Sequence, residues 1–296
     1  MKCSLFKTIE KRKRTMMTPR VAAIHDMSGF GRCSLTVAIP ILSAMGVQCC
    51  PLPTAFLSTH TGGFEGFTFL DMTDEMSKVA DHWASLGLTF QAVYSGFLGS
   101  ERQIGVVENF ICRFRGPDTV VVVDPVMGDY GRVYQTYTAA MCSGMARLAE
   151  LADVITPNLT EAAFLLGRPY DQLPQEEAGL QELVRELGLH GRRSVVLTGV
   201  SLSPGKTGAM CFDAKTSRTE TVQVDMIAHP LLGTGDIFAS VLTGALVRGD
   251  TLFSAAAQAA DFVRACAVHT VAQDLPLREG VDFEPMLGLL TKQNTI

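Results

Sequence analysis

Several features that would point directly to a function are missing from this 296-residue sequence. Its eight cysteines form no Cys-x-x-Cys pair and follow no regular spacing, which argues against a disulfide scaffold and a zinc site. We expect reduced, mostly buried thiols in a cytoplasmic protein. No apolar run is long enough to span a bilayer, so a membrane is not an expected partner. The chain is otherwise typical of a globular protein with a sizeable core, with 47% apolar and 19% charged residues.

Positive charge is scarce outside the N-terminus. The formal net charge is -5, but residues 1–20 contain seven Lys or Arg and one acidic residue, which leaves 18 basic and 29 acidic residues elsewhere. Nucleic acid is therefore not expected as a ligand, because phosphate backbones require a basic face. The basic start also lacks the apolar segment of a secretion signal. We expect residues 1–18 to be a disordered tail and residues 19–296 to form one domain.

A Walker A loop is absent as well. The segment 199–207 contains two glycines followed by Lys206 and Thr207, but five residues separate the glycines instead of four. A strand-like pattern follows, whereas a Walker A loop needs a helix whose N-terminus holds the phosphates. The segment is better explained as a polar loop before a hairpin.

Short apolar segments alternate with helical patterns along most of the chain. Residues 119–124 are apolar on both faces, as in a parallel strand that is covered on each side. Other strands are expected at 21–25, 47–53, 92–95, 153–156 and 194–198, with a hairpin over 208–213 and 218–225. Helices are expected at 33–45, 72–86, 101–114, 159–166, 175–188 and from 237 onward.

This alternation predicts an α/β fold with a doubly wound, mostly parallel central sheet and helices on both faces. Ligands of such sheets bind beyond the carboxyl ends of the strands. Asp26, Asp124, Asn158 and Thr198 lie at or just after predicted strand ends. The sequence therefore predicts that one site brings these side chains together.

The segment Gly233-Thr-Gly-Asp236 comes directly before an apolar, helix-favouring run. Backbone N–H groups at such a helix N-terminus favour an anion. An aspartate there is often a simple cap. A cap needs neither of the two glycines, however, whereas close approach of the backbone to a ligand favours them. Asp236 could accept a hydroxyl proton while the amides of 233–235 hold phosphoryl oxygens, so the segment predicts a small-molecule kinase.

Three further polar segments contain candidate ligands. The segment Asp124-Pro-Val-Met-Gly-Asp129 either forms an ordinary turn or supplies two carboxylates that bind Mg²⁺ or a monovalent cation. Tyr134 would lie in a flap over this site. Asn158 and Glu161 match a capping box, and their place after a strand end also suits a metal or phosphate site. The turn at residues 58–63 contains a histidine, hydroxyl groups and glycines, which suit a flat heteroaromatic ligand.

Together these segments resemble the pyridoxal kinase branch of the ribokinase superfamily over about residues 20–275. The likeness is carried by Ser58-Thr-His-Thr-Gly62, Asp124-Pro-Val-Met-Gly-Asp129, Ile155-Thr-Pro-Asn-Leu-Thr-Glu161 and Gly233-Thr-Gly-Asp236. The resemblance implies a ribokinase-like fold with no separate lid domain, and a homodimer. It also implies ATP-dependent phosphorylation of the 5′-hydroxymethyl group of pyridoxal, pyridoxine or pyridoxamine, with Mg²⁺ and a monovalent cation (K⁺).

The resemblance further implies a role for each matched residue. Asp236 matches the catalytic base, and the amides of Gly233, Thr234 and Gly235 match the anion hole. The residues implied to contact ATP are Asp129, Tyr134, Asn158, Glu161, Thr198, Gly233 and Gly235. The residues implied to hold metal ions are Asp124, Asp129, Thr156 and Glu161, with the monovalent cation at Asp124 and Thr156. The pyridine ring is expected at His60 and Thr61.

The turn at residues 24–31 departs from the animal pyridoxal kinases, which carry Ser-His near this point. Asp26 and Ser28 match instead the Asp-x-Ser-Gly of the hydroxymethylpyrimidine kinases of thiamine synthesis. Which of His25, Asp26 and Ser28 contacts the ring is therefore open, and so is the choice between the two heterocycles. The His60 turn favours a B6 vitamer. A ligand-binding regulator without catalysis is a third alternative, and the retained Asp236 argues against it.

Overall fold

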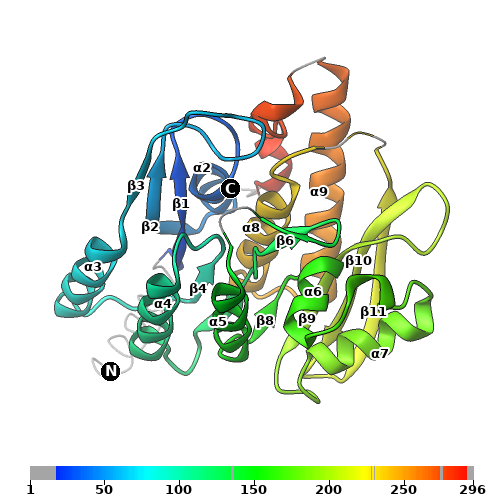
Figure 1. Ribbon diagram of the computed structural model, residues 1–296, viewed down its shortest axis with the longest axis horizontal. Coiled ribbons are helices and arrows are strands. Elements are labelled where there is room, and N and C mark those ends of the chain that lie inside the picture. Colours follow the sequence, from blue (N-terminus) through cyan, green and yellow to red (C-terminus); the bar gives the residue numbers. More distant parts are fainter. Residues whose placement is uncertain (1–17, 135–136, 228, 230, 274–275, 292–296) are drawn as a thin grey trace, which may run out of the picture.

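The computed structural model describes residues 18–134, 137–227, 229, 231–273 and 276–291. Within these ranges a nine-stranded sheet forms the centre of the molecule, in the order β11-β10-β9-β8-β5-β4-β1-β2-β3 (Figure 1). Its strands are β1 (Arg20–Ser28), β2 (Gln48–Leu57), β3 (Phe69–Asp71), β4 (Ala92–Ser95), β5 (Val120–Val123), β8 (Val154–Ile155), β9 (Ser194–Val200), β10 (Lys206–Asp213) and β11 (Arg218–Asp225).

The middle of the sheet is parallel. Neighbouring strands from β2 through β1, β4, β5 and β8 to β9 pair in parallel. Antiparallel pairings add β3 at one edge and the β10–β11 hairpin at the other. This arrangement confirms the predicted doubly wound, mostly parallel sheet.

Helices cover both faces of the sheet, as Figure 1 shows. They are α2 (Ser34–Ala44), α3 (Thr73–Ser85), α4 (Glu101–Phe114), α5 (Ala139–Glu150), α6 (Leu159–Leu166), α7 (Glu177–Leu187), α8 (Thr234–Val247) and α9 (Leu252–Ala272). Short 3₁₀ turns follow at η1 (Tyr170–Gln172), η2 (Leu277–Glu279) and η3 (Glu284–Leu290), and a small hairpin is formed by β6 (Gly128–Asp129) and β7 (Arg132–Val133).

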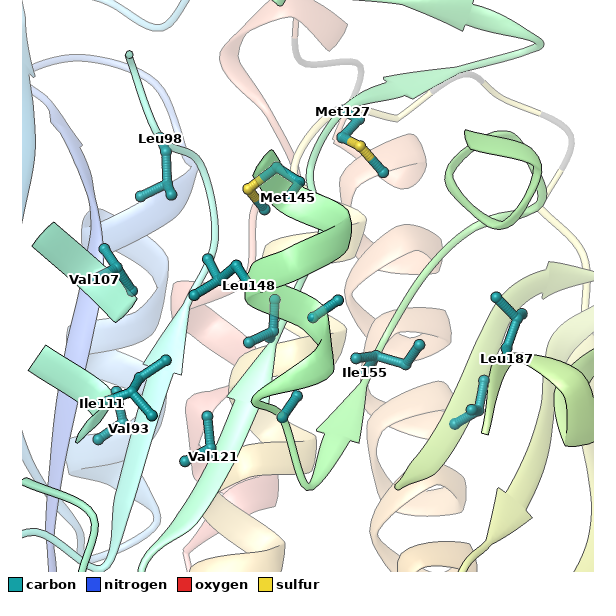
Figure 2. Packing of buried hydrophobic residues seen from close by; sticks show 14 of the residues in the cluster. Val93, Leu98, Val107, Ile111, Val121, Met127, Met145, Leu148, Ile155 and Leu187 are labelled. Atoms are coloured by element: carbon teal, nitrogen blue, oxygen red, sulfur yellow. The ribbon is translucent and has the colours of Figure 1, made fainter. Parts of the chain in front are cut away.

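Strand side chains divide between two cores. In β5, Val121 and Val123 belong to the core beneath α3 to α7, whereas Val122 belongs to the core beneath α2, α8 and α9. Figure 2 shows the first core around α5, where Leu148 lies between Val107 of α4 and Ile155 of β8. Because successive side chains of a strand point to opposite faces, an all-apolar strand fits only a sheet that is covered on both sides.

The order of the strands also fixes where a ligand can bind. The chain passes from β1 to β2 on one side and then returns to β4 on the other side of β1. Ligands of open α/β sheets bind at such a switch point, beyond the carboxyl ends of the strands. The helices α2 and α8 pack against each other and both begin near these strand ends. A candidate site is therefore expected where β1, β4, α2 and α8 meet.

No helix in the described part of the chain is long and apolar enough to cross a membrane. The predicted basic tail, residues 1–18, lies outside the described residues except for Thr18.

Candidate active site

The carboxylate of Asp26 lies near the end of β1 and is almost fully buried, with 5% of its surface exposed. Its two oxygens accept hydrogen bonds from the hydroxyls of Ser28, at 3.2 Å, and of Ser34, the first residue of α2. Burial raises the pKa of Asp26, and the two hydroxyl bonds lower it again. The buried carboxylate is thus held by neutral donors.

The neighbouring side chains of the same strand are less accessible. His25 is fully buried, and its ring packs edge-on against Tyr94 of β4, with 4.2 Å between the ring centroids. Neither ring nitrogen has a partner, and burial lowers the pKa of His25 to about 3, so the ring is neutral. Ser28 is also fully buried. Of the three candidates His25, Asp26 and Ser28, only Asp26 keeps a solvent-exposed surface, so burial argues against direct ligand contact by the other two.

Asp236 lies in the first turn of α8. The helix follows Gly233, which has a φ of 84°. A Cβ at Gly233 would overlap the carbonyl oxygen of Arg32, so the close approach of the two loops requires glycine. Burial raises the pKa of Asp236 to about 7; a hydrogen bond from the backbone amide of Ser34 lowers it, and the charge of Asp26 raises it. The partly accessible carboxylate therefore titrates near neutral pH, as suits a general base.

Asp124 lies directly after β5 and is 7% exposed. The hydroxyl of Thr156 donates to its Oδ1 at 3.1 Å. Burial holds the pKa of Asp124 well above its usual range, and the charges of Glu161 and Asp236 add to the effect. The structure thus brings the strand-end acid of β5 near both the acid of α6 and the acid of α8.

The start of α6 is hydrogen-bonded to the β6–β7 hairpin and to the residue before it. Asn158 and Glu161 form a complete capping box, as the sequence predicted. Glu161 also accepts from the backbone N–H of Met127, at 3.1 Å, and the side-chain amide of Asn158 donates to the carbonyl of Gly128 at 2.9 Å. Burial raises the pKa of Glu161 to about 7. The cap is therefore also the anchor of the hairpin.

Asp129 and Tyr134 lie on the exposed part of this hairpin region. The Oδ1 of Asp129 accepts from the backbone N–H of Tyr130 at 2.8 Å, and Tyr134 is 42% exposed. Burial raises the pKa of Tyr134, and the charges of Glu161 and Asp129 raise it further, so its hydroxyl lies near the acidic groups. Thr198 of β9 pairs with Asn158 in an isolated parallel β-bridge, which places it beside the start of α6.

These acids do not form a preassembled metal centre. Within the ranges that the structure describes, no group of three or more His, Cys, Asp or Glu side chains lies close enough together to hold a metal ion. Both carboxylate oxygens of Glu161 already accept backbone N–H groups. The predicted metal ligands interact in pairs: Thr156 with Asp124, Asp124 with Glu161 and Glu161 with Asp129. They do not form a site in which protein side chains alone could hold a metal ion.

The turn that contains His60 borders the site near Asp26. Its Nδ1 accepts from the amide of Gly62 at 3.1 Å, and its Nε2 lies 2.8 Å from the carbonyl oxygen of Arg278. Because Nδ1 accepts, Nε2 must carry the proton and donate. Both nitrogens are thus used within the protein, so His60 can offer a ligand only its ring, whereas Thr61 is exposed.

The segment 277–284 was not predicted to belong to the site. The backbone N–H of Arg32 donates to the carbonyl oxygen of Glu279 at 3.0 Å. The backbone N–H of Val281 donates to the carbonyl oxygen of Leu232 at 3.1 Å. The guanidinium of Arg32 pairs with Asp282 at 2.9 Å and with Glu284 at 2.8 Å. This segment therefore joins the loop after β1, the His60 turn and the loop before α8, through contacts that no local sequence pattern predicts.

Known proteins resemble this chain over most of its length. A family model described as Phosphomethylpyrimidine kinase matches residues 39–278. A pyridoxine/pyridoxal/pyridoxamine kinase of Bordetella avium is 29% identical over 250 residues, which cover 78% of this chain and 79% of that protein.

Solved structures also resemble this chain. A protein of Bacteroides thetaiotaomicron assigned as a phosphomethylpyrimidine kinase, crystallised with pyridoxal, is 44% identical with a TM-score of 0.88, and the match covers 93% of this chain and 96% of that one. A pyridoxal kinase of Lactobacillus plantarum is 29% identical with a TM-score of 0.85, covering 93% and 97%.

Proposed function

The chain belongs to the phosphomethylpyrimidine kinase family, within the ribokinase superfamily, and we propose that it is a pyridoxal kinase that uses ATP. It phosphorylates the 5′-hydroxymethyl group of pyridoxal, pyridoxine or pyridoxamine to the 5′-phosphate. The observation that carries this proposal is the place of Asp236: a carboxylate with a pKa of about 7, at a helix N-terminus, beside a second group of acids. The pyridoxal relatives support the choice of acceptor.

Each part of the site has a task in this reaction. Asp236 accepts the proton of the 5′-hydroxyl, whose oxygen then forms the new bond to phosphorus. The amides of residues 233–235 at the start of α8 donate to the oxygens of the phosphoryl group, where the helix dipole favours negative charge. ATP supplies that phosphoryl group. We expect the side chains of Tyr134, Asn158 and Thr198 to line the ATP-binding site.

The acids near Asp124 suit a bound cation. Asp124 and Glu161 are buried with raised pKa values, and neither forms an ion pair within the described residues. A nearby cation would favour their charged forms. Mg²⁺ usually keeps several waters and is bound by one or two carboxylates together with substrate phosphates. We therefore propose that Mg²⁺ is shared between the nucleotide and Asp129 or Glu161, and that K⁺ lies at Asp124 and Thr156.

The runner-up is a hydroxymethylpyrimidine kinase, because Asp26 and Ser28 match that enzyme's turn and because the family model carries its name. The two activities share the transfer chemistry and differ in the heterocycle. The turn at His60 and the pyridoxal-bound relative favour the B6 vitamers. We also expect a cytoplasmic protein that forms a homodimer, and sedimentation of the purified protein checks its oligomeric state.

A coupled assay of ADP release decides between these alternatives. Pyridoxal, pyridoxine, pyridoxamine and hydroxymethylpyrimidine are compared as acceptors, with and without K⁺ and Mg²⁺. We expect the highest kcat/KM for a B6 vitamer, with activity that requires Mg²⁺ and increases with K⁺. A strong preference for hydroxymethylpyrimidine would assign the thiamine activity instead, and no turnover of any acceptor would favour a non-catalytic regulator.

A further inference from the structure

The buried carboxylate of Asp26 has no cationic partner among the described residues. Ser28 donates to its Oδ2 at 3.2 Å, and the hydroxyl of Ser34 donates to its Oδ1. Within the described ranges, no Lys, Arg or His side chain forms an ion pair with it. Buried charges are normally paired, because an unpaired charge is costly to bury. A cationic group on a bound molecule therefore fits this carboxylate.

The cations of the neighbouring loops already have other partners. The guanidinium of Arg32 pairs with Asp282 at 2.9 Å and with Glu284 at 2.8 Å. The guanidinium of Arg278 lies over the ring of Phe64, 5.3 Å from the ring centroid. Neither side chain can neutralise the carboxylate at the end of β1 without giving up these contacts, so that carboxylate is left to a ligand.

Asp26 can accept a further hydrogen bond. Each of its oxygens takes one hydroxyl, whereas a carboxylate offers about four lone-pair sites. Asp26 keeps 5% of its surface exposed, while His25 and Ser28 on the same strand keep none. A positively charged donor suits this accessible edge best, because hydrogen bonds between charged groups are stronger than neutral ones. Such a donor would also favour the charged form of Asp26, whose pKa is raised by burial.

The start of α8 contacts the loop after β1. A Cβ at Gly233 would overlap the carbonyl oxygen of Arg32 in that loop. Further into the helix, the hydroxyl of Ser240 lies 3.4 Å from that of Tyr94 in β4. Asp236 precedes Ser240 by four residues and therefore shares its face of the helix. The base thus lies on the face of α8 that is directed at β4 and β1, close to the carboxylate at the end of β1.

We propose that Asp26 selects the acceptor by the substituent next to the reacting hydroxymethyl group, and that it favours a positively charged donor there. The inference rests on the proposed function and deepens it by naming the class of acceptor. The 4-substituent of a B6 vitamer is on the ring carbon adjacent to the one that carries the 5′-hydroxymethyl group. When the 5′-hydroxyl lies at Asp236, this substituent is the nearest other polar group of the ring, and it reaches Asp26.

The B6 vitamers differ in what this substituent offers a carboxylate. Pyridoxamine carries an aminomethyl group, which is protonated at neutral pH and donates a charge-assisted hydrogen bond. Pyridoxine carries a hydroxymethyl group, which donates a neutral hydrogen bond. Pyridoxal carries an aldehyde, which has no donor and turns an oxygen toward the carboxylate. Asp26 therefore favours pyridoxamine over pyridoxine, and pyridoxine over pyridoxal.

Steady-state kinetics at saturating ATP tests this order. We expect kcat/KM for pyridoxamine to exceed that for pyridoxal by about tenfold or more, with pyridoxine between them. Asp26→Asn keeps the shape of the side chain but removes its charge, so the ratio of pyridoxamine to pyridoxal should fall by about tenfold. Asp261→Asn, the same change at an exposed position of α9, should leave this ratio within about twofold. Equal kcat/KM for the three vitamers, or an unchanged ratio in Asp26→Asn, would overturn the proposal.

Calorimetry without nucleotide gives a second measurement that does not depend on turnover. It compares pyridoxamine with 4-deoxypyridoxine, which keeps the 5′-hydroxymethyl group but carries a methyl group in place of the charged donor. Wild-type protein should bind pyridoxamine about tenfold more tightly. Equal Kd values would overturn the role of Asp26, even if Asp26→Asn did not fold. Wild-type protein that phosphorylates no B6 vitamer but keeps this preference would instead overturn the proposed function, so the two failures are distinguishable.

Discussion

The two sides of the candidate site are built in different ways. The flap side, residues 124–134 and 156–161, is joined by bonds that span 30 to 34 positions of the chain, from Asn158 to Gly128 and from Met127 to Glu161. The loop side, residues 26–34, 60–62, 232–236 and 277–284, depends on contacts such as Arg32 to Asp282 and His60 to Arg278, more than 200 positions apart. The flap side can therefore form from one stretch of chain, whereas the loop side requires the complete fold.

This difference suggests that the two sides of the site bind different substrates. Nucleotide phosphates are the same for every acceptor, so a local and self-sufficient motif can hold them. In the proposed function, the acceptor is contacted by loops whose positions depend on the segment 277–284, so changes in that segment should alter acceptor binding more than phosphate binding. Asp236 lies where the two sides meet, because its helix follows the loop side while its charge acts on Asp124.

The largest effect is therefore expected at Asp236. Asp236→Asn removes the proton acceptor but keeps the shape of the side chain, so kcat should fall by about 10²- to 10⁴-fold, as for the loss of a general base. ATP binding, measured by calorimetry, should change little. Asp261→Asn, at an exposed position of α9, is the matched control. A kcat within tenfold of wild type would show that another group accepts the proton.

An intermediate effect should separate the two sides. Arg32→Ala removes the ion pairs to Asp282 and Glu284, which should loosen the loop side and raise the KM for the acceptor by about tenfold, equivalent to ~1.4 kcal/mol. Asn158→Ala removes the cap and the bond to Gly128, which should raise the KM for ATP by a similar factor. Steady-state kinetics with each substrate varied in turn measures both.

The controls for this crossed pair lie away from the site. Arg113→Ala breaks an exposed ion pair with Asp81, and Thr251→Ala removes the cap of α9. Neither should change either KM by more than twofold, since exposed pairs contribute little and the cap is remote. If Arg32→Ala and Asn158→Ala affected both substrates equally, the site would be one coupled unit and the distinction between its sides would fail.

The same distinction explains what the sequence could predict. The flap side follows from local signals: Asn158 and Glu161 three positions apart indicate a capping box, and Asp124 follows an unmistakably apolar strand. The clustering of Asp26 and Asp124 follows from strand ends that share one edge of a parallel sheet. The place of Arg32 does not follow, because its partners Asp282 and Glu284 lie in a segment with no periodic pattern.

Helix α5 was missed for a different reason. Ser143 and Gly144 in its centre weaken the helical pattern, since both have poor helix propensity. In the fold, a Cβ at Gly144 would overlap Cδ1 of Ile104 on α4, so glycine lets the two helices pack closely at this point. Packing between helices therefore overrides local propensity. The strand β3 was missed because three residues at a sheet edge give too short a pattern to detect.

The smallest expected effect concerns stability, and it returns to Asp236 as the meeting point of the two sides. Burial raises the pKa of Asp236 from 3.8 to about 7, so between these values the folded protein binds more protons than the unfolded chain. Its contribution to stability is complete below pH 4 and is lost as the pH rises through 7. Asp236→Asn abolishes this titration, so the variant should gain stability relative to wild type as the pH rises.

Thermal unfolding of the ligand-free proteins at pH 5 and pH 8 checks this sign. The Tm of Asp236→Asn minus that of wild type should be larger at pH 8 than at pH 5, by ~2–4 °C for each kcal/mol of relieved burial. The control Asp261→Asn should show no such dependence. An equal difference at both values would mean that Asp236 is already well solvated in the free protein, and that the base gains its raised pKa only when the acceptor closes the site.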